Sequence, residues 1–224
     1  MVTAGPTLAE VSETTLLARI FPFFPGGATV PVGPGDDAAV LATGSATVAT
    51  TDSMVRDRDW LDTWSSAADV ATKLLAQNLA DVAAMGATPT AVLVSLVADP
   101  RTPVAWAVDF ARALGEGATA AGVVVAGGDL SSAPAGVLMV SLTALGDLAG
   151  QPPVLRSGAR PGDLVAICGT LGRSAAGLAL LEAGADAAER GPGLRGLCLE
   201  HHLRPTAPLA AGRQAVTRGA TSMI

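Results

Sequence analysis

The stretch Gln77-Asn78-Leu79-Ala80-Asp81-Val82-Ala83-Ala84-Met85-Gly86-Ala87 forms the last part of a long helical pattern. The pattern begins with Ser66-Ala67-Ala68-Asp69, where the serine can cap a helix, and Gly86 predicts an end near Met85. Its large apolar residues do not share one face, namely Val70, Leu74, Leu75, Leu79 and Val82. We therefore expect a helix that is buried on more than one side.

Two polar residues interrupt this apolar helix. Asn78 and Asp81 are three positions apart and share the stripe that begins with Val70 and Leu74. Because a polar group in an apolar stripe costs free energy without a partner, each needs a bonding partner in the fold. They could cap neighbouring backbone groups or belong to a functional site. We favour the functional site.

Strand and helix patterns alternate on both sides of this helix. Before it we expect one helix from Leu8 to Ile20 and strands at residues 38–41 and 48–51. After it we expect a helix at residues 104–121 and strands at residues 92–97, 123–126 and 138–145. This order predicts an α+β protein that begins with an α/β domain containing a mixed sheet.

The character of the chain changes after residue 148. Residues 150–161 contain three prolines and two arginines, which is typical of a linker. We expect a strand at residues 163–168, helices at residues 174–183 and 209–216, and a last strand at residues 219–224. Because the chain stops on that apolar run, the second unit looks incomplete. We predict two domains, residues 1–148 and the start of another at residues 149–224.

Acidic residues are spread along the first domain beside the expected strands and helices. We expect Asp37, Asp52, Asp81 and Asp129 to lie at the edges of these elements and to converge in space. Two carboxylates in close contact repel each other by about 4 kcal/mol at an effective dielectric constant of about 20. Mg²⁺ can offset this repulsion, because it binds oxygen ligands and commonly carries substrate phosphates. The acidic residues therefore predict a site for magnesium and a nucleotide.

The composition excludes several classes of protein. The formal net charge is −6 and Lys73 is the only lysine, so we do not expect nucleic-acid binding. The chain shows neither a secretory signal nor an apolar stretch of the roughly 20 residues that span a bilayer. Cys168 and Cys198 are far apart and are expected to be reduced thiols. These features predict a cytoplasmic protein that does not bind membranes.

The other motifs are weaker indications. No Walker A motif is present, and the turn Gly169-Thr170-Leu171-Gly172-Arg173-Ser174 could bind phosphate or be only a tight connection. Arg156 could contact a triphosphate or be solvated. The adjacent His201 and His202 point in different directions on a helix, so we expect surface or capping roles. No set of residues for covalent catalysis can be assembled.

Several of these segments together resemble the thiamine-monophosphate kinase family. That family belongs to the superfamily of aminoimidazole ribonucleotide synthetase, selenophosphate synthetase and a hydrogenase-maturation protein. The similar segments cover nearly the whole chain and are residues 33–40, 50–55, 77–87, 127–129, 156–163 and 169–178. The string Asn78-Leu79-Ala80-Asp81, continued to Ala87, is the most specific to the superfamily.

The resemblance implies a function and a set of site residues. The activity would be a magnesium-assisted, direct transfer of phosphate from ATP to thiamine monophosphate, giving thiamine diphosphate in thiamine biosynthesis. The implied magnesium ligands are Asp37, Thr50, Thr51, Asp52, Asp81 and Asp129. Gly128, Asp129 and Arg156 would contact ATP, and no residue would act as a covalent nucleophile. The N-terminal domains of this family pair as a homodimer.

The sequence also departs from the family pattern in two places. Asp59-Trp60 stands where the family commonly has a substrate-binding histidine followed by an aromatic residue, so we assign Asp59 to the substrate site. The family continues beyond the position of Ile224 into a further acidic segment, so we expect a truncated chain with little activity alone. The alternatives are a non-catalytic, dimerising or nucleotide-binding remnant and another ATP-dependent member of the superfamily.

Overall fold

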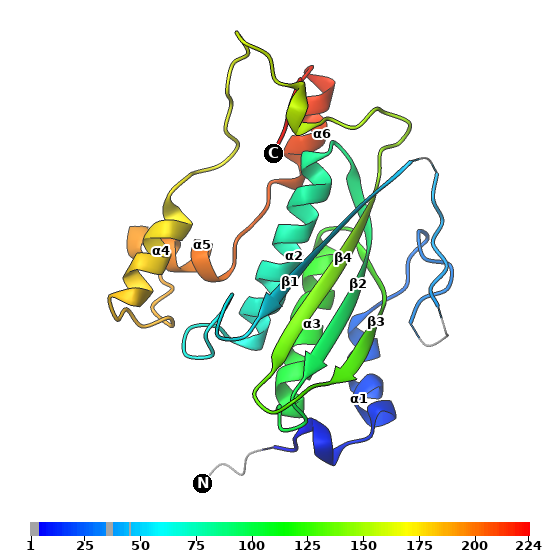
Figure 1. Ribbon diagram of the computed structural model, residues 1–224, viewed down its shortest axis with the longest axis vertical. Coiled ribbons are helices and arrows are strands. Elements are labelled where there is room, and N and C mark those ends of the chain that lie inside the picture. Colours follow the sequence, from blue (N-terminus) through cyan, green and yellow to red (C-terminus); the bar gives the residue numbers. More distant parts are fainter. Residues whose placement is uncertain (1–4, 35–37, 45) are drawn as a thin grey trace.

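The computed structural model describes residues 5–34, 38–44 and 46–224 (Figure 1). The strands are β1 (Thr47–Val55), β2 (Thr88–Ala98), β3 (Val124–Ser132) and β4 (Leu138–Asp147). The α-helices are α1 (Glu13–Ile20), α2 (Ala67–Ala84), α3 (Val104–Ala120), α4 (Arg173–Glu182), α5 (Leu194–Leu203) and α6 (Leu209–Thr217). Three short 3₁₀ helices complete the described elements: η1 (Leu8–Glu10), η2 (Phe21–Phe23) and η3 (Arg156–Gly158).

The four strands form one mixed sheet in the order β1-β4-β2-β3. β4 pairs in antiparallel fashion with both β1 and β2, whereas β2 and β3 are parallel and are joined through α3. The expected α+β class and mixed sheet are therefore confirmed. β1 and β2 are likewise parallel in direction, and β4 lies between them, so β1, α2 and β2 form a split βαβ unit.

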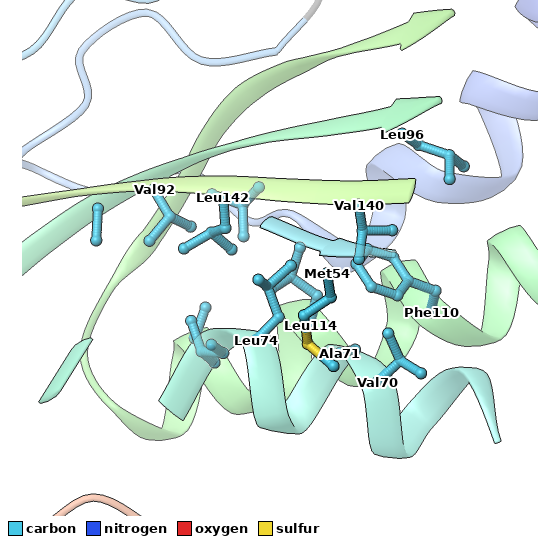
Figure 2. Packing of buried hydrophobic residues seen from close by; sticks show 14 of the residues in the cluster. Met54, Val70, Ala71, Leu74, Val92, Leu96, Phe110, Leu114, Val140 and Leu142 are labelled. Carbon is cyan, nitrogen blue, oxygen red and sulfur yellow. The ribbon is translucent and has the colours of Figure 1, made fainter. Parts of the chain in front are cut away.

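One face of the sheet is covered by α2 and α3 and carries the main hydrophobic core (Figures 1 and 2). Along β4, Leu138, Val140, Leu142 and Ala144 are buried, while the residues between them are partly exposed. Figure 2 shows Val140 and Leu142 directed toward Leu74 and Leu114 of the two helices. This alternation fixes which strand residues face α2 and which lie on the opposite, open face.

The buried helix α2 begins and ends where the sequence predicts. Ser66 caps it by accepting a hydrogen bond from the backbone N–H of Asp69, whose side chain bonds back to the N–H of Ser66. At the other end, Gly86 has a φ of +82°, a conformation that favours glycine. Local capping chemistry therefore sets the length of α2.

Several predicted elements differ from the observed ones because strand pairing extends or removes them. The expected strands at residues 48–51 and 123–126 continue through Asp52 and Asp129, which therefore lie inside β1 and β3 and not at their edges. Between residues 38 and 41, the described structure has only an isolated bridge from Val32 to Val40. Residues 163–168 and 219–224 form no strand, and the expected first helix is divided into η1 and α1.

The residues after 148 contribute helices that pack on α2 and on each other. Leu181 of α4 and Leu199 and Leu203 of α5 form a small buried cluster against Trp64. α6 approaches the end of α2 so closely that a Cβ on Gly212 would lie 2.1 Å from the backbone oxygen of Ala83. Within the described ranges, no helix has the length and apolar character needed to cross a bilayer.

Candidate functional site

The first group of candidate residues lies where β1 faces the middle of α2. Thr50 and Asp52 alternate with exposed residues along β1 and share the face that contains buried Met54. The Thr50 hydroxyl donates a hydrogen bond of 3.2 Å to Oδ2 of Asp81. The fold thus brings together two motifs that are 31 residues apart, and it places two carboxylates and a hydroxyl around one strand–helix contact.

Asn78 connects the same strand and helix, but as a structural residue. Its side chain is fully buried, with 0% of its surface exposed. Its Nδ2 donates to the carbonyl of Leu74 at 2.9 Å, and its Oδ1 accepts from the N–H of Asp52 at 3.1 Å. Both ends of the amide are therefore occupied by backbone groups. For Asn78, the alternative that it bonds to neighbouring backbone is confirmed.

Asp129 lies in the middle of β3 on the open face of the sheet. It is in register with Ser95 of β2, which is opposite Ser141 of β4, and these residues alternate with the buried ones. The hydroxyl of Ser131 donates to Oδ2 of Asp129 at 2.7 Å. Gly128 fits closely against β2, since a Cβ there would lie 2.0 Å from the carbonyl oxygen of Val94.

Thr51 lies on the same open face and belongs to this row of polar side chains. Its hydroxyl donates to the carbonyl of Leu142 at 3.1 Å and accepts a hydrogen bond from Thr143 at 3.2 Å. Thr143 and Ser141 continue the row across β4 toward Ser95 and Asp129. The side chains of the adjacent Thr50 and Thr51 therefore lie on opposite faces of the sheet, because successive side chains of a strand alternate between its faces.

A cavity of about 850 Å³ adjoins Asp129. This volume is within the range of sites that take a small molecule or a cofactor. The cavity is lined by the glycine-containing stretch 127–129, by hydroxyls of Ser95, Ser141 and Thr143, and by apolar side chains that include Phe24 and Phe110. Among the described lining residues none is Lys, Arg or His. Anionic groups bound here would therefore need a cation other than a side chain of this cavity.

The expected convergence of all four aspartates is only partly visible. Asp52 and Asp81 lie on the α2 side of β1, whereas Asp129 is on the open face of β3, at the other edge of the sheet. With β4 and β2 between them, β1 and β3 are roughly 14 Å apart at the usual strand spacing. Asp37 lies outside the described residues. Within the described part of the chain, no group of three or more His, Cys, Asp or Glu residues could hold a metal ion.

Arg156 and Asp59 occupy positions apart from this cavity. Arg156 is exposed in η3, and its carbonyl accepts a hydrogen bond from the Ser222 hydroxyl at 2.9 Å. Asp59 lies in the connection after β1, where its carboxylate accepts a hydrogen bond of 2.7 Å from the N–H of Val55. Neither is among the described residues that line the cavity. Their assigned contacts with ATP and substrate stay predictions.

Asp69 is the centre of an ion-pair cluster that the sequence alone did not predict. This capping residue of α2 is only 1% exposed and accepts two hydrogen bonds from Arg190, at 2.6 and 2.8 Å, and another from Arg204. Burial alone would raise the pKa of Asp69, but the hydrogen bonds from Arg190, Ser66 and Arg204 hold it well below its usual range. The cluster joins the start of α2 to the segment around α5. In the sequence, Asp69 is marked only by the capping box that it forms with Ser66, and that motif does not reveal the two arginines.

The single lysine also lies between the two parts of the chain. Burial lowers the pKa of Lys73, and the nearby negative charge of Asp59 opposes that shift. Burial, followed by the charge of Lys73, lowers the pKa of His202 on α5. The hydroxyl of Ser174 and Nδ1 of His202 are 3.3 Å apart. His202 is thus partly exposed and lies beside Ser174 at the start of α4.

Comparison with known proteins places this arrangement in a family. Residues 35–148 match the model of the AIR synthase related protein, N-terminal domain, and the chain belongs to this family. Within it, the chain is similar to thiamine-monophosphate kinase of Mycobacterium tuberculosis, with 43% identity over 226 residues. That alignment covers 100% of this chain and 65% of the relative.

Solved structures show the same similarity in three dimensions. Thiamine-monophosphate kinase from Stenotrophomonas maltophilia K279a has a TM-score of 0.79 and 30% identity, covering 92% of this chain and 65% of that chain. A structure of AaThiL complexed with AMPPCP and TMP has a TM-score of 0.68 and 28% identity. It covers 75% of this chain and 52% of its own. The chain therefore spans about 65% of the length of the first two of these proteins.

Proposed function

We propose that this chain binds ATP with Mg²⁺ and supplies the nucleotide-binding part of a thiamine-monophosphate kinase. The phosphate acceptor would be thiamine monophosphate, and the product would be thiamine diphosphate. Support comes from the similarity to kinases over the whole chain and from AaThiL, a similar protein that was complexed with AMPPCP and TMP. The complete activity would also need what the longer relatives contain beyond the matched region.

The observation that carries this proposal is the contact between the two acidic motifs. Thr50 and Asp81 come from segments that are far apart in sequence, and their side chains meet at 3.2 Å beside Asp52. All three supply oxygen atoms, which are the ligands that Mg²⁺ prefers. The residues therefore fit a magnesium ion that keeps several of its waters and also contacts phosphate.

The fit of a metal can also be judged from the cavity beside Asp129. Because its described lining contains no basic side chain, the triphosphate would meet Asp129 without a compensating charge. When bound, Mg²⁺ would neutralise phosphate charge and hold the transferred group in place. Asp52 and Asp81 would hold one ion, and Asp129 would hold another on the opposite face of the sheet. Gly128 would allow the nucleotide to approach the strand closely.

The open face of the sheet supports a further proposal, that the chain forms a homodimer. α2 and α3 cover only one face, and Leu93 on the other face is 38% exposed. A sheet face with apolar residues is normally buried against another layer. Pairing of two open faces would bury Leu93 and would enclose the row of hydroxyls that leads to Asp129.

Isothermal calorimetry with Mg–ATP tests the nucleotide proposal through Asp81→Asn. We expect Asp81→Asn to bind Mg–ATP at least about tenfold more weakly than the unchanged chain, because one negative ligand of the metal is lost. The thermal unfolding temperature should change little, since the carboxylate is exposed and bonds to one hydroxyl. Asp109→Asn on the exposed face of α3 makes the same chemical change away from the site and should bind normally.

Two outcomes would contradict the proposal. A flat titration of the unchanged chain, in the presence of Mg²⁺, would favour a non-catalytic remnant of the family. Equal affinity in magnesium and in excess EDTA would show that nucleotide binding does not use a metal at the acidic residues.

A further inference from the structure

Lys73 is a half-buried cation that has no direct counter-ion. It lies on α2, and across the described residues its ammonium group makes no hydrogen bond and no ion pair. A charged group that is partly removed from water normally gains such a partner, because its lost hydration must be replaced. The ammonium group therefore keeps three N–H donors for another binding partner.

Two carboxylates near Lys73 are already bonded to other groups. Asp69, one turn earlier on α2, accepts hydrogen bonds from Arg190 and Arg204. The charge of Asp59 acts on Lys73, but its carboxylate accepts a backbone hydrogen bond of 2.7 Å in its own loop. Neither acid therefore neutralises Lys73 by direct contact.

The ion pairs of Asp69 also set α5 beside this part of α2 (Figure 1). Lys73 lies one turn after Asp69, on the same side of α2. His202 lies in the last turn of α5, two residues before Arg204. The two basic side chains are close enough for the charge of Lys73 to act on His202. Helix packing thus brings a second basic group toward the ammonium.

Ser174 at the start of α4 adds a hydroxyl to this arrangement. Its Oγ lies 3.3 Å from Nδ1 of His202, and Ser174 is exposed. Within the described chain, Nε2 of His202 makes no hydrogen bond, so the ring keeps one nitrogen for a ligand. Ser174 ends the turn of residues 169–174, for which the sequence left phosphate binding open. Groups from three helices therefore meet at one partly exposed place.

Basic groups also gather around this contact. Arg173 of α4 adds another cation, and its Nη1 lies 3.4 Å from Nε2 of His201. The carboxylates that act on Lys73 and His202, those of Asp59 and Glu182, do so without an ion pair to either. Like charges brought together repel each other, and a bound anion offsets that repulsion.

We propose that Lys73, His202 and Ser174 form a binding site for a phosphate dianion. A tetrahedral phosphate has acceptor oxygens in several directions, so it can accept hydrogen bonds from an ammonium, an imidazole and a hydroxyl on three helices. A carboxylate carries one charge and would offset only one of the two basic groups. The phosphate can be inorganic phosphate or the phosphate group of a small monoester, because the charge and the oxygens are shared.

This site is separate from the acidic residues proposed to hold Mg²⁺. Lys73 and Asp81 are eight positions apart on α2, which corresponds to about 12 Å along the helix axis. Lys73, His202 and Ser174 are also not among the described residues that line the cavity beside Asp129. Phosphate binding here therefore needs no metal, and the proposal goes beyond nucleotide binding.

The two histidines of the chain allow the site to be tested by NMR. Their ring signals are followed against pH in EDTA, in chloride and in inorganic phosphate at equal ionic strength, and His201→Asn assigns the signal of His202. Lys73 faces this ring from α2, and Ser174 and Glu182 face it from α4. We expect phosphate to raise the pKa of His202 by at least about 0.5, because a bound anion favours the charged ring.

Thiamine monophosphate and thiamine separate the two sources of the phosphate group. Equal concentrations of inorganic phosphate and thiamine monophosphate at half-saturation would assign the site to the phosphate group alone. Half-saturation at tenfold less thiamine monophosphate would assign it to an ester, and only this result rests on the proposed substrate. Thiamine should leave the His202 signal unchanged, and a thiamine response equal to that of its phosphate would contradict the proposal.

Lys73→Gln is the main variant, with Arg19→Gln as its matched control. Lys73→Gln should weaken phosphate binding at least about tenfold, because a charge-assisted hydrogen bond is lost. In chloride it should raise the pKa of His202, because a like charge is removed. Arg19→Gln removes an exposed cation of α1 and should bind phosphate normally. Ser174→Ala alters an exposed residue and should weaken binding severalfold, which keeps the test valid if Lys73→Gln fails to fold.

Three results would overturn the proposal. The pKa of His202 could be the same in chloride and in phosphate, or the phosphate response could survive both Lys73→Gln and Ser174→Ala. Arg19→Gln could also weaken the response as much as Lys73→Gln, which would show general screening of charge. Because the titrations contain EDTA, failure of the chain to bind Mg–ATP would leave their outcome unaffected, so the two proposals fail separately.

Discussion

At the scale of single residues, similar patterns in the sequence have different roles in the fold. Asn78 and Asp81 share one stripe of α2, but the amide bonds only backbone whereas the carboxylate meets the hydroxyl of Thr50. Asp69 belongs to the capping box of α2, and it is also the buried centre of an ion-pair cluster. A side chain's role therefore depends on partners that local sequence does not reveal.

The cluster predicts a large effect of Asp69→Asn on stability. The variant removes the charge that compensates Arg190 and Arg204, so we expect a loss of about 2–4 kcal/mol in the free energy of unfolding. Urea denaturation measures this loss. Asp186→Asn, whose side chain bonds only to an exposed turn amide, serves as the control and should change stability by less than about 1 kcal/mol.

The same group predicts a dependence of stability on acid. Because folding lowers the pKa of Asp69 below its ordinary value of 3.8, the folded state gains stability while the carboxylate is charged. This stabilisation by the Asp69 carboxylate is complete at pH values above the ordinary pKa of 3.8, and it is lost as the pH falls below that value. Asp69→Asn should therefore flatten the decline in unfolding temperature below about pH 4. An unchanged decline would show that other carboxylates control acid unfolding.

At the scale of elements, close backbone contact positions α6 on α2. Gly212 lies where a side chain would collide with the backbone of Ala83, so the two helices can approach only because this position is glycine. A close backbone contact at a glycine also joins α4 to α5, where a Cβ on Gly177 would lie 2.2 Å from the carbonyl oxygen of Cys198. Glycines inside helices therefore mark the contacts that hold the last part of the chain.

The contact predicts an unusual result for Gly212→Ala. In an exposed helix this change stabilises by up to about 1 kcal/mol, because alanine is the better helix former. Here the added methyl should push α6 away from α2 and lower the unfolding temperature. Ala210→Gly, an exposed change in the same helix, reports the intrinsic propensity alone. Stabilisation by Gly212→Ala would contradict the close packing.

At the scale of the whole molecule, the sheet divides the candidate residues between two environments. Asp52 and Asp81 lie on the side covered by α2, and Asp129 lies on the open side next to the cavity. A single chain therefore presents two partial sets of oxygen ligands. The proposed homodimer concerns the part of the sheet around Leu93 that α2 and α3 leave uncovered.

The open face allows the homodimer to be tested by sedimentation velocity. Leu93→Arg places a charge in the middle of the proposed interface, so the variant should sediment as a monomer where the unchanged chain sediments as a dimer. Val137→Arg alters a residue of equal exposure in the connection between β3 and β4 and should remain dimeric. A dimer that survives Leu93→Arg would place the interface elsewhere.

Much of the architecture could be predicted from local patterns. The length of α2 follows from Ser66 and Gly86, which satisfy its ends within a few residues, and α3 follows from its apolar periodicity. Strand lengths could not be predicted as well, because a strand ends where its neighbour stops pairing. Residues 163–168 show this most clearly, since a strong strand sequence without a neighbour forms no strand in this structure.

The sequence by itself determined the buried helix, the α+β class and the acidic motifs, because capping and periodicity act over a few residues. Only the tertiary structure decided that Thr50 meets Asp81 while Thr51 and Asp129 face the other side of the sheet. It also decided that Asp69 pairs with Arg190 and Arg204, which lie 121 and 135 residues further along the chain. Such contacts depend on how strands register and helices pack, and those are properties of the whole chain.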